Sequence, residues 1–168
     1  MMHMTMDSKE VFVDTNALIY QTFEDFDEEK HESASRTLEY LSDNDYTIYI
    51  SSQVLREFFA IATNGKFFEK PLSVPEAVAK MKEFEDNFTV LYDTDSSLSK
   101  LRELVLEYSI KKKDIYDANI VSTMITNGIK DIFSFKRKDF VNYKEIKLFE
   151  TPSPRVDKPE SDEPENEN

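Results

Sequence analysis

The feature that most constrains the fold is a short apolar run that ends abruptly in polar residues. Residues 10–16 read Glu-Val-Phe-Val-Asp-Thr-Asn, so three apolar residues lead directly to an acid, a hydroxyl and an amide. Such a run is typical of a buried strand in a parallel sheet. The carboxylate of Asp14 would then lie at the carboxyl end of the strand, where open α/β sheets bind ligands. Taken alone, this acid has an ordinary alternative role as the cap of the next helix.

The same strand pattern recurs along the chain and alternates with helical patterns. Further strands are expected at residues 46–51, 88–92, 130–135 and 145–149. Strands that alternate with helices indicate an α/β layer with a mostly parallel sheet, here of four or five strands flanked by helices. The spacing itself does not fix the order of the strands in the sheet.

Three polar signals mark expected helix ends. Ser52 is a plausible N-cap for a helix that runs to Thr63. Ser73 and Glu76 form the pattern of a capping box, with a proline in the first turn. The dipeptide Asn127-Gly128 is a typical signal for the end of a helix.

Length and composition indicate one folded domain with a tail at each end. A chain of 168 residues suits a single domain. We expect an N-terminal tail over residues 1–9 and the folded domain over residues 10–150. Residues 151–168 contain four prolines, many acids and few apolar side chains, which predicts a disordered acidic tail.

The composition also limits the classes of function. The chain has no cysteine, which excludes disulfides and thiolate metal sites. No stretch approaches the roughly eighteen apolar residues of a membrane span, so we expect a soluble cytoplasmic protein without a membrane partner. The formal charge of −13 disfavours bulk attraction to nucleic acid, unless metal ions and local basic clusters line the contact.

Two acids lie on the apolar faces of predicted helices. Glu57 has Val54 three residues before it and Ile61 four residues after it. Asp117 shares its helix face with Ile120 and other apolar side chains. A carboxylate in such a place is costly unless it is paired or bound to a cation. A salt bridge or a position at the rim of the core is the alternative for Glu57.

Four segments, taken in order, carry a resemblance to a known family. These segments are VFVDTN at 11–16, SSQVLREF at 51–58, IYDA at 115–118 and IFSFKRKDF at 132–140. With this order and spacing the chain resembles the PIN-domain ribonucleases, and among them the VapC-like toxins of bacterial and archaeal toxin–antitoxin pairs. The resemblance spans residues 11–149 and implies a PIN-like three-layer fold.

The resemblance also implies a set of site residues. An acidic quartet around Mg²⁺ or Mn²⁺ would consist of Asp14, Glu57, Asp117 and Asp139, with Thr15, Asn16 and Ser134 as accessory polar residues. The family pattern often places Thr-Asn before the last acid, whereas this chain reads Ser134-Phe135-Lys136. Ser134 would therefore supply the hydroxyl, and the usual amide contact is in doubt.

Carboxylates without a histidine or cysteine partner suit a hard cation such as Mg²⁺ or Mn²⁺. We expect in-line attack of water on an RNA phosphodiester, and the resemblance implies 5′-phosphate and 3′-hydroxyl products. Asp14 and Asp117 would be the direct metal ligands. Glu57 would orient the water, and Asp139 would complete a second, weaker metal site. For Asp114, one turn before Asp117, we favour a capping role.

Two basic triplets precede two of these acids, and each suits a polyanion that crosses the site. They are Lys111, Lys112 and Lys113 before Asp117, and Lys136, Arg137 and Lys138 before Asp139. The alternative is a pair of solvated loops.

The expected partners are RNA, a second copy of the chain and an antitoxin protein. The homodimer is implied by the resemblance. An antitoxin helix would cover apolar surface at Phe67 and Phe68, both expected to be exposed. A stand-alone processing nuclease and a non-catalytic PIN-like module that binds RNA or protein are the open alternatives. A haloacid-dehalogenase-like phosphatase is a weaker one, because it needs a second Asp where this chain has Asn16.

Overall fold

The structure, a computed structural model, describes residues 8–154. Its centre is a five-stranded sheet that is parallel throughout, with the strand order β3-β2-β1-β4-β5. The strands are β1 (Glu10–Val13), β2 (Thr47–Ser51), β3 (Thr89–Leu91), β4 (Asp131–Phe133) and β5 (Lys147–Leu148). All five predicted strands are therefore present, and four of them are shorter than the apolar runs that predicted them.

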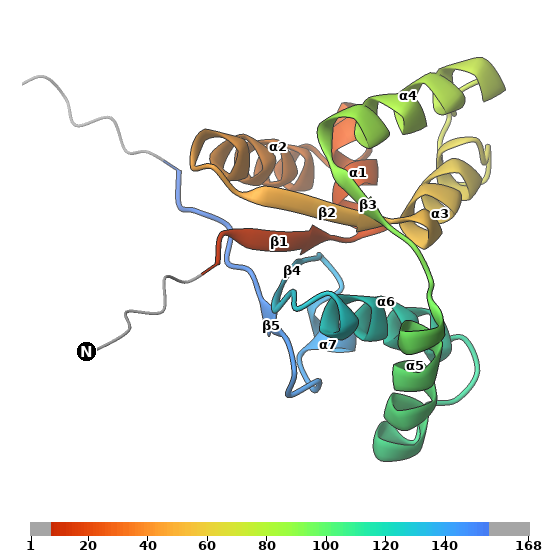
Figure 1. Cartoon of the computed structure of the whole chain (residues 1–168). Helices are drawn as coiled ribbons and strands as arrows, with labels where there is room; N and C mark the ends of the chain where they lie inside the picture. The colour runs from red at the N-terminus through yellow and green to blue at the C-terminus, as the bar shows by residue number, and fades with distance from the viewer. Residues whose placement is uncertain (1–7, 155–168) are drawn as a thin grey trace, which may run out of the picture.

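Helices cover both faces of this sheet and complete three layers. They are α1 (Thr15–Thr22), α2 (Glu28–Asp43), α3 (Ser52–Ala62), α4 (Val74–Asn87), α5 (Asp95–Tyr108), α6 (Asp114–Thr126) and α7 (Arg137–Phe140), with a short 3-10 helix, η1 (Glu24–Phe26). In Figure 1, α1 and α2 lie above the sheet, and α6 and α7 lie below it. The predicted three-layer α/β architecture is confirmed.

Strand β1 forms the middle of the hydrophobic core. Val11, Phe12 and Val13 have no exposed surface. Phe12 lies opposite Tyr49 of β2 on one side and Ile132 of β4 on the other. A strand with neighbours on both edges and helices on both faces has no polar side, so its sequence shows no alternation.

The helix ends follow the predicted signals with one shift. Ser51, rather than Ser52, is the N-cap of α3, and its side chain accepts a hydrogen bond from the Val54 backbone N–H. The predicted N-cap at Ser52 is therefore wrong by one residue, because β2 continues directly into the helix. The capping box of Ser73 and Glu76 is present at the start of α4.

The strand order determines where a site can form. From β1 the chain passes to β2 and β3 on one side of the sheet, and β4 and β5 then lie on the other side. The order reverses between β1 and β4, so the helices that follow these two strands diverge. Open α/β sheets bind ligands at the carboxyl ends of the strands beside such a reversal. Asp14 follows β1 at this point and Ser134 follows β4.

The terminal segments fall largely outside the described residues. The predicted disordered tail is described only over residues 151–154, which have no regular secondary structure. Of the predicted N-terminal tail, residues 8 and 9 are described. Over residues 8–154, no helix is long and apolar enough to cross a bilayer.

Candidate active site

Asp14 is an acid that lies in the interior, with 1 % of its surface exposed. Its Oδ1 accepts a hydrogen bond of 2.8 Å from the Thr15 backbone N–H at the start of α1. Burial raises the pKa of Asp14, while hydrogen bonds from Ser134 and Thr15 and the charge of Lys136 oppose that rise. The residue caps a helix and also presents a carboxylate that needs positive charge nearby to stay ionised.

Asn16 and Ser134 connect the ends of β1 and β4. The Ser134 hydroxyl donates to Asp14 Oδ2 at 2.7 Å, and the Asn16 amide donates to the same oxygen at 3.0 Å. Asn16 Oδ1 in turn accepts from the Phe135 backbone N–H at 2.9 Å. Asn16 thus supplies an amide contact within the site, although the segment Ser134-Phe135-Lys136 lacks the Asn that the family pattern often has.

Glu57 is joined to the same region through Thr15. The Thr15 hydroxyl donates to Glu57 Oε2 at 2.8 Å, and Gln53 Nε2 donates to Glu57 Oε1 at 2.9 Å. Both carboxylate oxygens therefore have a neutral donor, and these two hydrogen bonds set the orientation of the carboxylate. Thr15 is buried and Glu57 is partly buried, as its place on an apolar helix face predicted.

Gln53 and Asn119 belong to the site although the sequence did not single them out. Gln53 Nε2 also donates to the Tyr116 backbone carbonyl at 3.0 Å, and the Asn119 amide donates to Gln53 Oε1 at 2.8 Å. These bonds connect α3 to the first turns of α6. The available signal was the spacing of Gln53 and Glu57, which are four residues apart and share one helix face.

Asp117 faces the other acids from the first turn of α6. Burial raises the pKa of Asp117 and the charge of Lys136 lowers it, while the charges of Asp14, Asp139 and Glu57 raise it further, to about 6. Each of the other three predicted acids therefore acts electrostatically on Asp117. Its Oδ1 lies 3.7 Å from the Lys136 ammonium, a long ion pair.

Asp139 lies in α7 and is exposed, whereas Asp117 is partly buried. Asp114 does not cap α6 as expected, because Lys113 occupies the N-cap position and Asp114 is the first helical residue. Asp114, Asp117 and Asp139 all line one cavity beside the site. The outer edge of the site is therefore more acidic than the predicted quartet alone.

The carboxylates of the site are the right kind of ligand for a hard divalent ion. The distances between them in the structure, however, are not those of a metal site. Carboxylate oxygens are the ligands that Mg²⁺ and Mn²⁺ prefer. Within residues 8–154, however, no three acidic or histidine side chains stand close enough together to hold one ion. Asp14, Glu57, Asp117 and Asp139 are the residues that would hold such an ion, and of these Asp14 and Glu57 are held in place by hydrogen bonds.

The two basic triplets differ in their contacts. In the second, Lys136 pairs with Asp117, Arg137 pairs with Glu150 at 2.7 Å, and Lys138 lines the cavity that contains Asp117 and Asp139. In the first, the side chains of residues 111–113 are exposed in the turn before α6. Both triplets therefore flank the acids, and their role in binding RNA stays a prediction.

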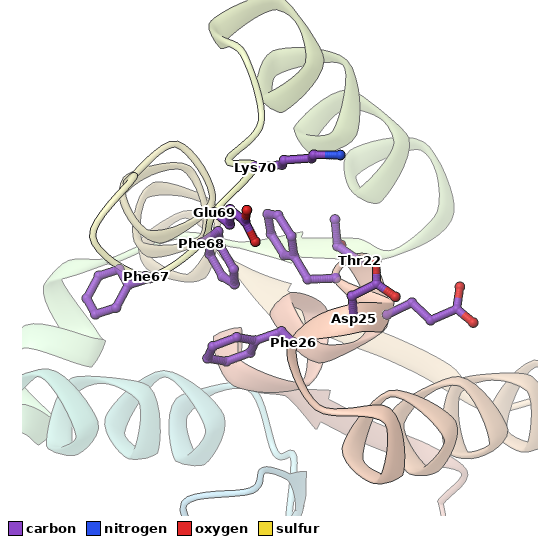
Figure 2. Close-up of a pocket in the computed structure, with 9 residues that line it drawn as sticks. Thr22, Asp25, Phe26, Phe67, Phe68, Glu69 and Lys70 are labelled. Carbon is purple, nitrogen blue, oxygen red and sulfur yellow. The ribbon is translucent and has the colours of Figure 1, made fainter.

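A separate cavity of about 570 Å³ lies between the end of α1, η1 and the loop after α3, and none of the four acids lines it. Figure 2 shows its aromatic walls, which include Phe26 and Phe68. Phe67 is 54 % exposed, as expected, but Phe68 is buried, because its ring stacks on Phe23 with centroids 3.7 Å apart. The expectation that Phe68 is exposed was wrong.

Comparison with known proteins gives one family and a set of similar folds. The model of the PIN domain family matches residues 11–145. No curated protein sequence matches the chain.

Solved structures share the fold at low identity. VapBC2 from Rickettsia felis, bound to a DNA fragment from its promoter, aligns with a TM-score of 0.62 and 21 % identity over 83 % of this chain and 97 % of that chain. The sarcin-ricin loop cleaving toxin VapC20 from Mycobacterium tuberculosis aligns with a TM-score of 0.59 and 16 % identity over 81 % and 98 %. DNA-bound VapBC from Salmonella typhimurium aligns with a TM-score of 0.60 and 20 % identity over 83 % of this chain and 96 % of that chain.

The likeness to these structures concerns the fold, whereas the family model matches the sequence over most of the described residues. The carboxylates at the reversal of strand order lie within that match, and Asn16 stands where a phosphatase of the haloacid-dehalogenase type needs its second acid. The chain belongs to the PIN-domain family, whose members are nucleases that generally use divalent metal ions.

Proposed function

We propose that the protein is a metal-dependent endoribonuclease and the toxin of a toxin–antitoxin pair. One observation carries the proposal: Asp14 and Glu57 are both hydrogen-bonded to Thr15 at the carboxyl end of β1, and Asp117 and Asp139 line one cavity beside them. Asp14 follows β1, and the other three acids belong to α3, α6 and α7, so the proposed site combines costly negative charges from four separate parts of the chain. A bound cation would stabilise these neighbouring carboxylates, and a metal-dependent nuclease uses such a cation in catalysis.

In this proposal the acids have separate tasks. Asp14 and Asp117 bind the ion directly, and Asp139 contributes to a second, weaker site. Glu57, held by Thr15 and Gln53, orients the attacking water. The ion, Mg²⁺ or Mn²⁺, would lower the pKa of water and polarise a phosphoryl oxygen. The residues Asn16 and Ser134 keep Asp14 in position through their hydrogen bonds.

The two basic triplets bind the RNA backbone on either side of the acids. The overall negative charge of the chain does not attract RNA, so contact depends on these local cations and on the bound ion. The proposed location is the cytoplasm, where RNA is available.

The aromatic cavity in Figure 2 is the proposed place for an antitoxin segment. Phe67 presents an exposed ring beside it, and the rim carries Glu24, Asp25 and Glu69 with one lysine. An apolar helix face with flanking basic residues would complement this surface. A toxin–antitoxin complex from Klebsiella pneumoniae is among the similar structures, and a homodimer is proposed on the resemblance alone.

The decisive experiment incubates the purified full chain with total cellular RNA and Mn²⁺ and then maps new 5′ ends by sequencing. Discrete new 5′-phosphate ends are expected with the wild-type chain and none with Asp14→Asn. Asp25→Asn is the matched control, because Asp25 is an exposed acid at the aromatic cavity and should leave cleavage unchanged. Equal cleavage by wild type and Asp14→Asn would contradict the proposed site.

A second candidate is a non-catalytic PIN module that binds RNA or protein. The observation that favours it is the present spacing of the acids, in which no three described side chains are set to hold an ion. Titration with Mn²⁺ followed by calorimetry separates the two candidates. Saturable binding that is lost in Asp14→Asn supports the nuclease, whereas absence of both binding and cleavage supports the binding module.

A further inference from the structure

A second cavity lies directly beside the acid site. It has a volume of about 240 Å³ and lies among α5, α6 and α7. Asp117 and Asp139 are among the residues that line it, so any group bound in the cavity lies next to the proposed reaction centre. The volume is below the usual range for a drug-sized ligand, so the cavity suits part of a nucleotide.

The hydroxyl of Tyr143 is the distinctive group of this cavity. Tyr143 is only 6 % exposed, and its side chain forms no hydrogen bond with any residue of the described range 8–154. Every fully buried side-chain nitrogen or oxygen in that range has a partner. The Tyr143 hydroxyl is therefore not sealed in the core, and the cavity that the residue lines is where it can meet a ligand.

Tyr108 lines the same cavity and provides a contrast. Its hydroxyl donates to Glu145 at 2.9 Å and accepts from the Lys144 backbone N–H at 3.1 Å. The ring centroids of Tyr108 and Tyr143 lie 4.8 Å apart. The Tyr108 hydroxyl thus forms hydrogen bonds within the protein, whereas the Tyr143 hydroxyl is available to a ligand. An available hydroxyl on a buried side chain is unusual, because burial without a partner costs free energy.

The charges around the cavity select what can bind there. Burial raises the pKa of Tyr143 to about 12, with further contributions from the charges of Asp117 and Asp114, so its hydroxyl stays a hydrogen-bond donor. Asp114, Asp117 and Asp139 make the cavity unfavourable for a phosphate. A neutral group that accepts from Tyr143 and donates to a carboxylate fits both conditions. The ribose 2′-hydroxyl is such a group, and it distinguishes RNA from DNA.

We propose that this cavity of about 240 Å³, here called the ribose pocket, binds one ribose of the RNA next to the scissile phosphate. The Tyr143 hydroxyl donates to the 2′-oxygen, and the 2′-hydroxyl donates to the Asp114 carboxylate. Lys138 faces the phosphate attached to that ribose. The inference rests on the proposed ribonuclease function and adds to it a reason for preferring RNA to DNA.

The test compares two matched variants, Tyr143→Phe and Tyr108→Phe, with the wild-type full chain. The probes are short oligoribonucleotides that carry the mapped cleavage sequence, or an unstructured sequence if none is found, with a single 2′-deoxynucleotide moved along the strand. Cleavage is measured as kcat/KM in Mn²⁺, and binding is measured by fluorescence anisotropy in Ca²⁺. Thermal unfolding of each variant serves as the measure of folding.

For the wild type, loss of one 2′-hydroxyl at a single position should weaken binding by more than about fivefold, because it removes the hydrogen bonds to both Tyr143 and Asp114. Tyr143→Phe should weaken binding of the all-RNA probe by about fivefold, the effect of one neutral hydrogen bond, and should reduce the effect of the deoxy substitution at that position by the same factor. Tyr108→Phe should keep the full sensitivity. Tyr143→Phe should also unfold at the wild-type temperature or above it, because its hydroxyl has no partner in the protein.

The possible failures are distinguishable. If the wild type cleaves RNA but Tyr143→Phe remains as sensitive to the deoxy substitution as the wild type, the ribose pocket is wrong and the nuclease function stands. If the coupling is seen in binding but no cleavage occurs, the pocket stands and the nuclease function is wrong. Absence of both binding and cleavage would contradict both.

Discussion

The two halves of the acid site are held in different ways. The inner half consists of Asp14, Asn16, Ser134, Thr15 and Glu57, which are connected by hydrogen bonds of 2.7–3.1 Å. The outer half consists of Asp117, Asp139, Lys136 and Lys138, where the one ion pair among these four side chains spans 3.7 Å. The inner half is therefore fixed by the fold, and the outer half can adjust to what it binds.

The difference follows from where the chain places each half. Four of the five inner residues lie at or just after the carboxyl ends of the adjacent strands β1 and β4, and Glu57 reaches them from α3 through its hydrogen bond with Thr15. The outer residues lie on the first turn of α6 and on the short helix α7, close to solvent. We expect the loss of a hydrogen-bonding side chain in the inner half to lower stability, and substitutions in the outer half to affect mainly charge and ligand binding.

The largest expected effect is the loss of cleavage in Asp14→Asn, by about a thousandfold or more, because the variant removes a direct ligand of the proposed ion. The free energy of unfolding should change little, since the amide keeps the shape of the side chain and relieves a buried charge. Cleavage rates in Mn²⁺ and urea unfolding in EDTA measure the two effects. A variant with more than a tenth of the wild-type rate would remove Asp14 from the mechanism.

Ser134→Ala should lower the free energy of unfolding by about 2 kcal/mol, because it removes the buried hydroxyl that donates to Asp14 and accepts from Asn16. Asp139→Asn, its counterpart in the outer half, should change it by no more than about 0.5 kcal/mol. Urea unfolding measures both variants. Equal losses would abolish the distinction between the two halves.

The pH dependence of stability tests Asp117. Its pKa is raised from 3.8 to about 6 in the folded chain, so the folded state binds this proton more tightly than the unfolded state does. The resulting stabilisation is complete below pH 4 and is lost as the pH rises through about 6. The shift corresponds to about 3 kcal/mol, and because Asp117 is partly exposed and screened by solvent we expect a loss of about 1.5 kcal/mol in EDTA. The loss should be absent in Asp117→Asn, as measured by urea unfolding between pH 4 and 7. The same slope in both proteins would show that another group is responsible.

The smallest effect concerns Lys136. Lys136→Met should reduce the slope of log Kd for RNA against log salt by about 0.7, the contribution of one phosphate contact to a single strand. Stability should change by less than about 1 kcal/mol, since the Asp117 ion pair is long and the lysine is exposed. Lys82→Met, an exposed lysine of α4 paired with Asp86, is the matched control. An unchanged slope in Lys136→Met would favour a merely solvated loop.

The inner half was predictable where the information is local. The run that ends at Asp14 predicted both a central strand and its acid, because burial on both faces leaves a continuous apolar segment. The hydrogen bond between Ser134 and Asp14 was not predictable from spacing, because the residues are 120 positions apart and the neighbour of β1 is set by tertiary packing. The resemblance, rather than periodicity, placed Ser134 in the site.

The differences between the sequence-based predictions and the structure also have physical reasons. Gln53 and Asn119 are neutral, and an amide on a helix does not signal a cost in the way that a carboxylate on an apolar face does. The expected cap at Asp114 failed because the turn at residues 111–113 already continues into α6. Phe68 seemed exposed from its loop composition, but it packs on an aromatic ring that belongs to a distant helix end.

The shortness of the outermost strands has a consequence for assembly. β3 spans three residues and β5 spans two, so each rim of the sheet offers few backbone N–H and C=O groups for another chain to continue the ladder. Strand addition is therefore a poor means of oligomerisation or inhibition here. Any protein that docks on this molecule should recognise side chains on helices and loops, and peptide mimics built as extended strands should fail to bind.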